Sequence, residues 1–347
     1  MTGRENIADL PAAVLAVCGW KGAGKTTVIE AVLPRLAAVG LRVAALKHDL
    51  HGFEVDRPGK DSDRLFRAGA DVLLRSSGEA FARWHGLSLA DALATLAAEH
   101  DLVLVEGHKD TALPKVWLAG AGDAAPPDDL AEVREVLPWD GGRVDALERL
   151  ATALVRDHHE ARPRLAGVLL GGGSSRMGQA KHLLEYGGRT ILERVVAAVV
   201  PHAEEVVLLG GGEVPPALAA SRRLPDPPGL EGPIAGLLAA LRWAPVATWT
   251  VVACDLPLLD AGAVAWLRSC RRPGVRAVVP LDSRGRPEPL FAAWEPQARP
   301  LLERIAAAGG GPSAVAGEPG VATPPIPAAL APLLRNVNTP DELASLP

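Results

Sequence analysis

Two stretches of the chain follow one pattern, in which a short apolar run leads through a glycine-rich turn into a helical period. The first run is Val14–Cys18 with its turn at Gly19–Lys25, and the second is Leu165–Leu170 with its turn at Gly171–Gly178. Strand and helix patterns alternate after each start, which is typical of parallel sheets covered by helices. Because the two turns differ in sequence, the pattern predicts an α/β chain of two distinct domains, both with mainly parallel sheets.

The hydrophobic periodicity also predicts where the chain divides and where its other elements lie. We expect a first domain over residues 1–157, a polar linker over 158–164 and a second domain over 165–347. In the first domain we predict strands at Arg42–Lys47, Asp71–Arg75, Leu102–Val105, Lys115–Leu118 and Arg134–Leu137, and helices from Thr26, at Ser88–His100 and at Val144–Asp157. In the second we predict strands at Glu205–Leu209, Trp249–Ala253 and Arg276–Pro280, and helices from about Thr190, at Pro233–Trp243, Ala261–Arg271 and Gln297–Ala308.

Composition narrows the class of protein. A chain of 347 residues is too long for one typical core and suits two. With 48% hydrophobic and 22% charged residues it can bury such cores and is not a disordered tail. The formal net charge is -5 and no basic block occurs, so nonspecific nucleic-acid binding, which needs clustered cations, gets no support.

The cysteines and apolar runs bear on the compartment. Cys18, Cys254 and Cys270 are scattered without metal-ligand spacing, which fits a reducing compartment and argues against a disulfide framework. We see no signal peptide at the N-terminus, and the apolar runs are interrupted well before membrane-spanning length. We therefore expect a cytoplasmic protein with neither nucleic acid nor a membrane among its partners.

The first glycine-rich turn has the composition of a phosphate cradle. Its sequence GWKGAGKT fits the pattern G-x-x-x-x-G-K-[ST] in full, between a predicted strand and a predicted helix. Small residues let backbone N–H groups converge on phosphate oxygens at the positive end of the helix. A chance glycine-rich turn is the alternative. Lys25 is expected to reach the β- and γ-phosphates and the Thr26 hydroxyl to ligate Mg²⁺. The candidate nucleotide-binding residues here are Gly19, Gly22, Gly24, Lys25, Thr26 and Thr27.

Acidic and histidine residues follow the neighbouring predicted strands. Glu106 ends the apolar run DLVLVEG, where its carboxylate can hold the metal's water shell or orient an attacking water; an exposed strand-end acid is the alternative. Asp49 and Asp61 lie in a charged, turn-rich segment and are candidates for a link to the metal. His48 and His51, in the same segment, fit surface positions equally well.

The second glycine-rich turn belongs to a different type of binding loop. It lacks the GK[ST] ending, but a strand-to-helix turn followed by Arg176 and Lys181 can still wrap a triphosphate, because the two cations neutralise its charge. Asp255 follows the apolar run TWTVVAC and should lie at the carboxyl edge of the sheet, where open α/β sheets bind ligands. Mg²⁺ often uses one or two carboxylates plus substrate phosphates, so Asp255 is the preferred metal ligand. A turn-capping acid is the alternative. Asn338, in RNVNTPDELA, is a further candidate to line this edge, and a plain helix cap is its alternative.

Over residues 12–157 the chain resembles the molybdopterin-guanine dinucleotide biosynthesis adaptor family of small P-loop GTP-binding proteins. The resemblance rests on GWKGAGKTT, LKHDLHGFEVDRPGKDSDRLFRAGA and LVLVEGHKDTALPKV, which occur in this order. It implies a P-loop NTPase fold, binding of GTP and Mg²⁺, and slow GTP hydrolysis. It also implies a helper role in delivering nucleotide or cofactor to a transferase.

Over residues 164–347 the chain resembles the molybdenum cofactor guanylyltransferase family. The resemblance rests on LLGGGSSRMGQAKHLLEYGGRTILERV, GPIAGLLAAL, ACDLPLL and NVNTPDELA. It implies a Rossmann-like nucleotidyltransferase fold that joins GMP from GTP to molybdopterin and releases pyrophosphate. Carried over to this chain, it implies that Asp226 contacts the nucleotide, that Asp255 binds both GTP and Mg²⁺, and that Arg176, Lys181 and Asp255 are catalytic. The other implied GTP-binding residues are Leu169, Leu170, Gly171 and Gly172, together with Lys181.

Two departures from the guanylyltransferase pattern keep other functions open. Ala180 stands where that family usually has an aspartate before the lysine, and an asparagine expected after the second strand is not visible in LLGGGEV. The alternatives are a molybdopterin cytidylyltransferase or another nucleotidyltransferase, and a GTP-dependent cofactor carrier without catalysis. The expected partners are molybdopterin and GTP. The molybdenum insertion protein and the acceptor molybdoenzymes or their chaperones are further candidates.

Overall fold

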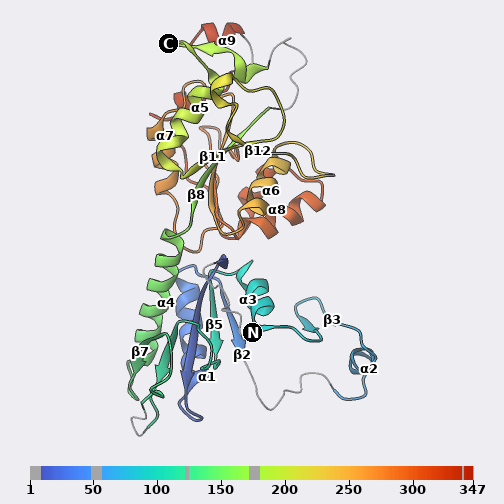
Figure 1. Ribbon diagram of the computed structural model, residues 1–347, viewed down its shortest axis with the longest axis vertical. Helices are drawn as coiled ribbons and strands as arrows, with labels where there is room; N and C mark the ends of the chain where they lie inside the picture. Colours follow the sequence, from blue (N-terminus) through green and yellow to red (C-terminus); the bar gives the residue numbers. More distant parts are fainter. Residues whose placement is uncertain (1–8, 48–56, 122–124, 172–179, 338–339, 347) are drawn as a thin grey trace.

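The computed structural model describes residues 9–47, 57–121, 125–171, 180–337 and 340–346 and contains two α/β units (Figure 1). A five-stranded sheet organises the first unit and a seven-stranded sheet the second. The prediction of an α/β chain with two mainly parallel sheets is confirmed. Within the described residues, no helix combines the length and the apolar character needed to cross a bilayer.

The first unit is a parallel sheet with the strand order β2-β5-β1-β6-β7. Its central strands are apolar on both faces, as expected for a sheet covered by helices on both sides. Helices α1 and α4 cover one face around Leu36 and Leu147, and α3 covers the other around Leu93. The elements are β1 (Ala13–Gly19), α1 (Lys25–Ala38), β2 (Val43–Lys47), α3 (Leu89–Ala97), β5 (Leu102–Glu106), β6 (Lys115–Leu118), β7 (Val133–Leu137) and α4 (Arg143–Glu160).

A small arm extends from the first unit beside α3 (Figure 1). It consists of α2 (Asp61–Arg67) and an antiparallel hairpin of β3 (Val72–Arg75) and β4 (Ala80–Arg83). The segment of β3 was predicted as a strand, but its pairing with β4 was not. Leu73 and Trp84 of the arm are exposed.

The second unit has the strand order β12-β11-β8-β13-β15-β14-β16. The sheet is mainly parallel, but β15 runs antiparallel to both of its neighbours. Helix α6 packs on one face, and α5 and α7 pack on the other. The main elements are β8 (Arg164–Leu169), α5 (Ile191–Val199), β11 (Glu205–Leu209), β12 (Arg222–Leu224), α6 (Pro233–Trp243), β13 (Thr248–Ala253), α7 (Ala261–Ser269), β14 (Ala277–Val278), β15 (Phe291–Trp294), α8 (Ala298–Ala307), β16 (Val321–Ala322) and α9 (Pro340–Ala344).

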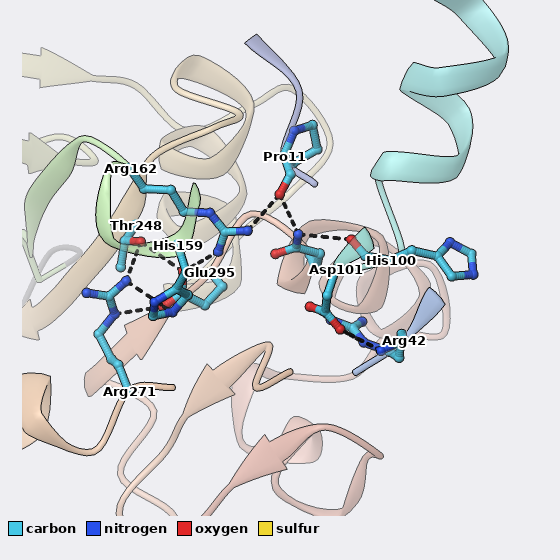
Figure 2. Close-up of polar contacts among 10 residues, drawn as sticks. Pro11, Arg42, His100, Asp101, His159, Arg162, Thr248, Arg271 and Glu295 are labelled. Atoms are coloured by element: carbon cyan, nitrogen blue, oxygen red, sulfur yellow. Dashed lines mark hydrogen bonds and ion pairs between the residues drawn. The ribbon is translucent and has the colours of Figure 1, made fainter. Parts of the chain in front are cut away.

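A buried polar cluster, here called the junction, joins the two units (Figure 2). The Glu295 carboxylate accepts hydrogen bonds from Arg162 and Arg271, both at 2.7 Å, and lies 3.3 Å from His159 at the end of α4. Arg162 also donates to the Pro11 carbonyl at 2.7 Å, so one guanidinium holds both units. The junction consists of Pro11, His100, His159, Arg162, Thr248, Arg271, Glu295 and Gln297.

The backbones of the two units also meet directly, at Gly274 and Gly40. A Cβ on Gly274 would lie 2.4 Å from the Gly40 carbonyl oxygen, and Gly274 has a positive φ of 82°. Any other residue there would be strained and would push the units apart. The contact between the units is therefore close as well as polar.

The units meet through the amino ends of their parallel strands. Pro11 and His100 precede β1 and β5, whereas Arg162 and Thr248 lie at the start of β8 and β13. Glu295 joins them because β15 runs antiparallel to β13. The carboxyl ends of the two sheets therefore point away from each other (Figure 1). Since β1 and β8 are each about 20 Å long, the two carboxyl edges lie more than about 35 Å apart.

His158, the neighbour of His159 in the chain, makes the stability of the contact between the two units sensitive to acid. Its ring faces the backbone of Leu10 and Pro11, and burial, assisted by the charge of Arg162, lowers its pKa from the ordinary 6.5 to about 4. Between these two pH values the unfolded chain binds a proton that the folded chain does not. We therefore expect the free energy of unfolding to fall as the pH drops from about 6.5 towards 4.

Urea titrations of the native chain and of His158→Gln at pH 7 and pH 5 test this expectation. The native chain should lose more stability over this interval than the variant, which lacks the titrating ring. His85→Gln, on the arm, serves as the control and should keep the native difference. An equal loss in the native chain and in His158→Gln would contradict the assignment.

Candidate functional site

The first candidate site is the loop between β1 and α1, at the carboxyl edge of the first sheet. Gly19 ends β1, and Gly24 adopts a left-handed conformation, with φ 78°, directly before the helix. This conformation suits glycine and turns the loop into the helix N-terminus. Lys25 donates to the carbonyls of Gly19 and Trp20, both at 3.0 Å, and so closes the loop over itself. Of the other predicted residues, Gly22 lies within the loop, and Thr26 and Thr27 lie in the first turn of α1.

Glu106 lies at the end of β5, which is paired with β1. The Thr26 hydroxyl donates to Glu106 Oε2 at 2.9 Å, and Lys47 Nζ lies 3.4 Å from Glu106 Oε1. The structure thus brings the predicted hydroxyl and the predicted carboxylate into contact beside the loop. Two hard oxygen donors at this position fit Mg²⁺, which prefers oxygen ligands.

A buried arginine that the sequence analysis did not single out holds the loop from behind. Arg143, the first residue of α4, donates to the Ala23 carbonyl at 3.0 Å and to the Pro138 carbonyl at 2.6 Å. Its second terminal nitrogen donates to the Ala119 carbonyl. One guanidinium therefore ties the loop to the ends of β6 and β7. Burial lowers its pKa.

The second candidate site is a pocket of about 430 Å³ at the carboxyl edge of the second sheet. The ends of β8, β11 and β13 form its floor, and the N-terminus of α6 forms part of its wall. The predicted residues Leu169, Leu170, Gly171, Asp226 and Asp255 all line it. Gly172, Arg176 and Asn338 lie outside the described residues, as do Asp49, His48 and His51 of the first unit.

Asp255 has the features expected of a metal-binding carboxylate. Its Oδ1 atom is buried and has no hydrogen-bond partner among the described residues. Burial raises the pKa of the carboxyl, and the nearby charge of Lys181 counteracts part of this rise. An unpartnered buried oxygen is costly unless a ligand satisfies it. No group of three or more His, Cys, Asp or Glu gathers as a metal cluster within the described residues, so a cation here would take its remaining ligands from substrate or water.

Cys254 contacts Gly171, where the glycine turn begins. Its Sγ atom accepts a hydrogen bond from the Gly171 backbone N–H at 3.2 Å. Burial raises the pKa of this thiol to about 11, so it stays protonated near neutral pH. A neutral thiol is a poor nucleophile, and the residue acts as a strut between the ends of β8 and β13.

Among the pocket residues that the sequence analysis missed, three are polar or charged. Glu288, Ser313 and Asn336 line the pocket from segments far along the chain. Burial and the charge of Asp282 raise the pKa of Glu288. A local motif signal was available only for Asn336, which lies two residues before the predicted Asn338 in RNVNTP. By contrast, Asp61 lies on the exposed arm, where it pairs with Arg64.

Two protein families match the chain. The family described as molybdopterin guanine dinucleotide synthesis protein B matches residues 14–131, and the MobA-like NTP transferase domain matches residues 166–321. The first match contains the loop with Lys25, Thr26 and Glu106, and the second contains Asp226 and Asp255 of the pocket. The two nucleotide-type sites thus fall in separately recognised parts of the chain.

Individual relatives divide in the same way. The chain is 37% identical over 110 residues to the molybdopterin-guanine dinucleotide biosynthesis adapter protein of Haemophilus influenzae, which covers 30% of this chain and 62% of that protein. It is 35% identical over 136 residues to the Escherichia coli adapter protein, covering 36% of this chain and 75% of that protein. It is 37% identical over 146 residues to the molybdenum cofactor guanylyltransferase of Rhodopseudomonas palustris, covering 39% of this chain and 68% of that protein. The chain thus covers 62% of the length of the first relative, which is less than two thirds. It covers 75% and 68% of the other two, which is more than two thirds.

Proposed function

Because the first half of the chain belongs to the molybdopterin guanine dinucleotide synthesis protein B family and the second half to the MobA-like NTP transferase family, we propose that the chain makes molybdopterin guanine dinucleotide. The second unit transfers GMP from GTP to the molybdopterin form of the molybdenum cofactor. The first unit binds and slowly hydrolyses GTP as a helper. The observation that carries the proposal is the pocket in which a glycine turn, Asp226 and the buried Asp255 meet.

The transfer reaction needs electrostatic help more than a base. The terminal phosphate oxygen of molybdopterin is already an anion and attacks the α-phosphorus of GTP. A new phosphorus–oxygen bond forms, the bond to the bridging oxygen of the β-phosphate breaks, and pyrophosphate leaves with its electrons. Because two anions must meet, positioning and charge stabilisation dominate the barrier.

The residues of the pocket divide this work. Leu169, Leu170 and Gly171 hold the nucleotide at the end of β8, and Asp226, which also lines the pocket, contacts it. Asp255 would hold Mg²⁺, and the ion would supply positive charge to the triphosphate. Lys181, whose charge already acts on Asp255, stabilises the leaving pyrophosphate, and we assign the same role to Arg176.

In the first unit the loop cradles the phosphates of a second GTP. Lys25 exchanges its contacts with the Gly19 and Trp20 carbonyls for the β- and γ-phosphates. Thr26 and Glu106 hold Mg²⁺ beside them. The two sites lie at the carboxyl edges of two sheets whose amino ends face each other (Figure 1), so one chain binds two separate GTP molecules.

The proposed chemistry also bears on the location and the partners of the chain. GTP as substrate and three free cysteines both support a cytoplasmic location. The molybdenum insertion protein and the acceptor molybdoenzymes or their chaperones are the partners we propose for substrate supply and product delivery.

Incubation of the full chain with molybdopterin, GTP and Mg²⁺, followed by mass detection of the dinucleotide, tests the proposal. Formation of the guanine dinucleotide with release of one pyrophosphate per product is expected. CTP in place of GTP tests the cytidylyl alternative, and a faster reaction with CTP would replace our assignment. Binding of GTP and molybdopterin without any pyrophosphate release would favour a non-catalytic carrier.

A further inference from the structure

An exposed tryptophan follows β7 on the same sheet edge as the phosphate-binding loop. Trp139 has 49% of its surface exposed and lies in a loop with internal hydrogen bonds. In that loop the Asp140 backbone N–H donates to the Pro138 carbonyl at 2.9 Å, and the Gly142 N–H donates to the Asp140 carboxylate at 2.8 Å. The ring therefore lies on the surface beside the carboxyl edge of the sheet, where a ligand of the phosphate-binding loop can reach it.

Arg143 connects this ring to the phosphate-binding loop. Its guanidinium carbon lies 4.5 Å from the centroid of the Trp139 ring, over the ring face. The same guanidinium donates to the Ala23 carbonyl within the loop. Cation–π contact and three carbonyl hydrogen bonds therefore hold the ring at a fixed position relative to the loop.

The position of the ring matches the reach of a bound nucleotide. Strand β7 is two strands away from β1 in the order β1-β6-β7, which displaces its end by about 10 Å along the carboxyl edge. Ribose and base together bridge such a displacement when the phosphates occupy the loop. About half of the Trp139 surface is exposed, and stacking on an aromatic ring holds any base by its flat face.

We propose that Trp139, held by Arg143, is the base-stacking platform of the first site: the purine of a nucleoside triphosphate lies on its ring while the phosphates occupy the glycine-rich loop. The inference rests on the proposed binding of GTP by the first unit and adds the residue that holds its base. Trp20 is a weaker candidate because it lies within the loop itself, edge-on to Trp117 at 5.4 Å.

Calorimetric titration of the full chain with GTP and with inorganic tripolyphosphate, both with Mg²⁺, tests the proposal. The part of the measured GTP binding that is lost in Lys25→Ala is assigned to the first site. In Trp139→Ala we expect this component to weaken about tenfold or more for GTP, because a stacked base is lost, while tripolyphosphate keeps its affinity. Trp139→Phe should retain most of the GTP affinity, and Trp84→Ala, an exposed tryptophan on the arm, should change neither ligand.

The outcomes separate the proposal from its premise. Unchanged GTP affinity in Trp139→Ala would overturn the stacking role. Equal weakening of GTP and tripolyphosphate would overturn it too, because the ring would then act only by holding the loop. If Lys25→Ala removes no GTP-binding component, the proposed function of the first unit fails as well.

Discussion

Replacing Asp255 with alanine is expected to abolish GMP transfer while the first unit still binds GTP. Asp255 offers a buried oxygen that no described residue partners at the pocket floor, and the transferring phosphates must be neutralised there. Loss of one preorganised charge-stabilising group typically lowers the rate a hundredfold or more, about 3–4 kcal/mol. The measurement is the rate of dinucleotide formation, with GTP binding followed in parallel.

Stability separates this effect from unfolding. Burial raises the pKa of Asp255, so its ionised form disfavours the folded state near neutral pH. The alanine variant should therefore melt no earlier than the native chain. Glu303→Gln is the matched control. Glu303 lies on α8, outside the pocket, and its carboxylate forms a surface pair with Arg242. Full transfer activity in Asp255→Ala would end the metal assignment.

Much of the architecture could be predicted from the sequence where local patterns were unambiguous. The predicted bounds of Lys115–Leu118, Glu205–Leu209 and Pro233–Trp243 are those of β6, β11 and α6. Strand β15 was missed because FAAW is apolar on both faces and so shows no alternation. The pairing of β3 with β4 was missed because the arm buries little apolar surface, which leaves a weak pattern.

The candidate sites show the same division between local and long-range information. Residues at strand-to-turn boundaries, such as Gly171 and Asp255, could be placed because the carboxyl edge of a parallel sheet collects ligands. Glu288 and Arg143 could not, because only the fold brings them to their sites. The contact between Glu106 and Thr26 was not predicted, because it needs β5 next to β1, which an apolar run alone does not establish.

The junction lay beyond the reach of sequence patterns, because no motif marks a carboxylate that pairs across two units. Glu295 follows the apolar run of β15 and is fully buried among Arg162, Arg271 and Thr248. Burial alone would raise its pKa, but the hydrogen bond from His159 and the charges of Arg271 and Arg162 lower it well below the usual range. The carboxylate is therefore ionised throughout the neutral range and anchors the cluster.

Replacing Glu295 with alanine is expected to destabilise the chain by about 3–5 kcal/mol, because two arginines remain buried without their counter-charge. Urea unfolding at pH 7 measures this loss. Glu303→Ala, which breaks an exposed ion pair, is the control and should cost less than about 1 kcal/mol. A loss in Glu295→Ala no larger than that of the control would contradict the anchoring role.

The same variant distinguishes what the junction does from what the pocket does. Glu295 lies at the amino edge of the second sheet, and Asp255 lies at its carboxyl edge, the length of β13 away. Low temperature keeps the variant largely folded, and we then expect transfer per folded molecule to remain near the native rate while the unfolding midpoint falls. If transfer collapses in molecules that are still folded, the junction must also set the geometry of the pocket through β13, and the two ends of the sheet would not be independent.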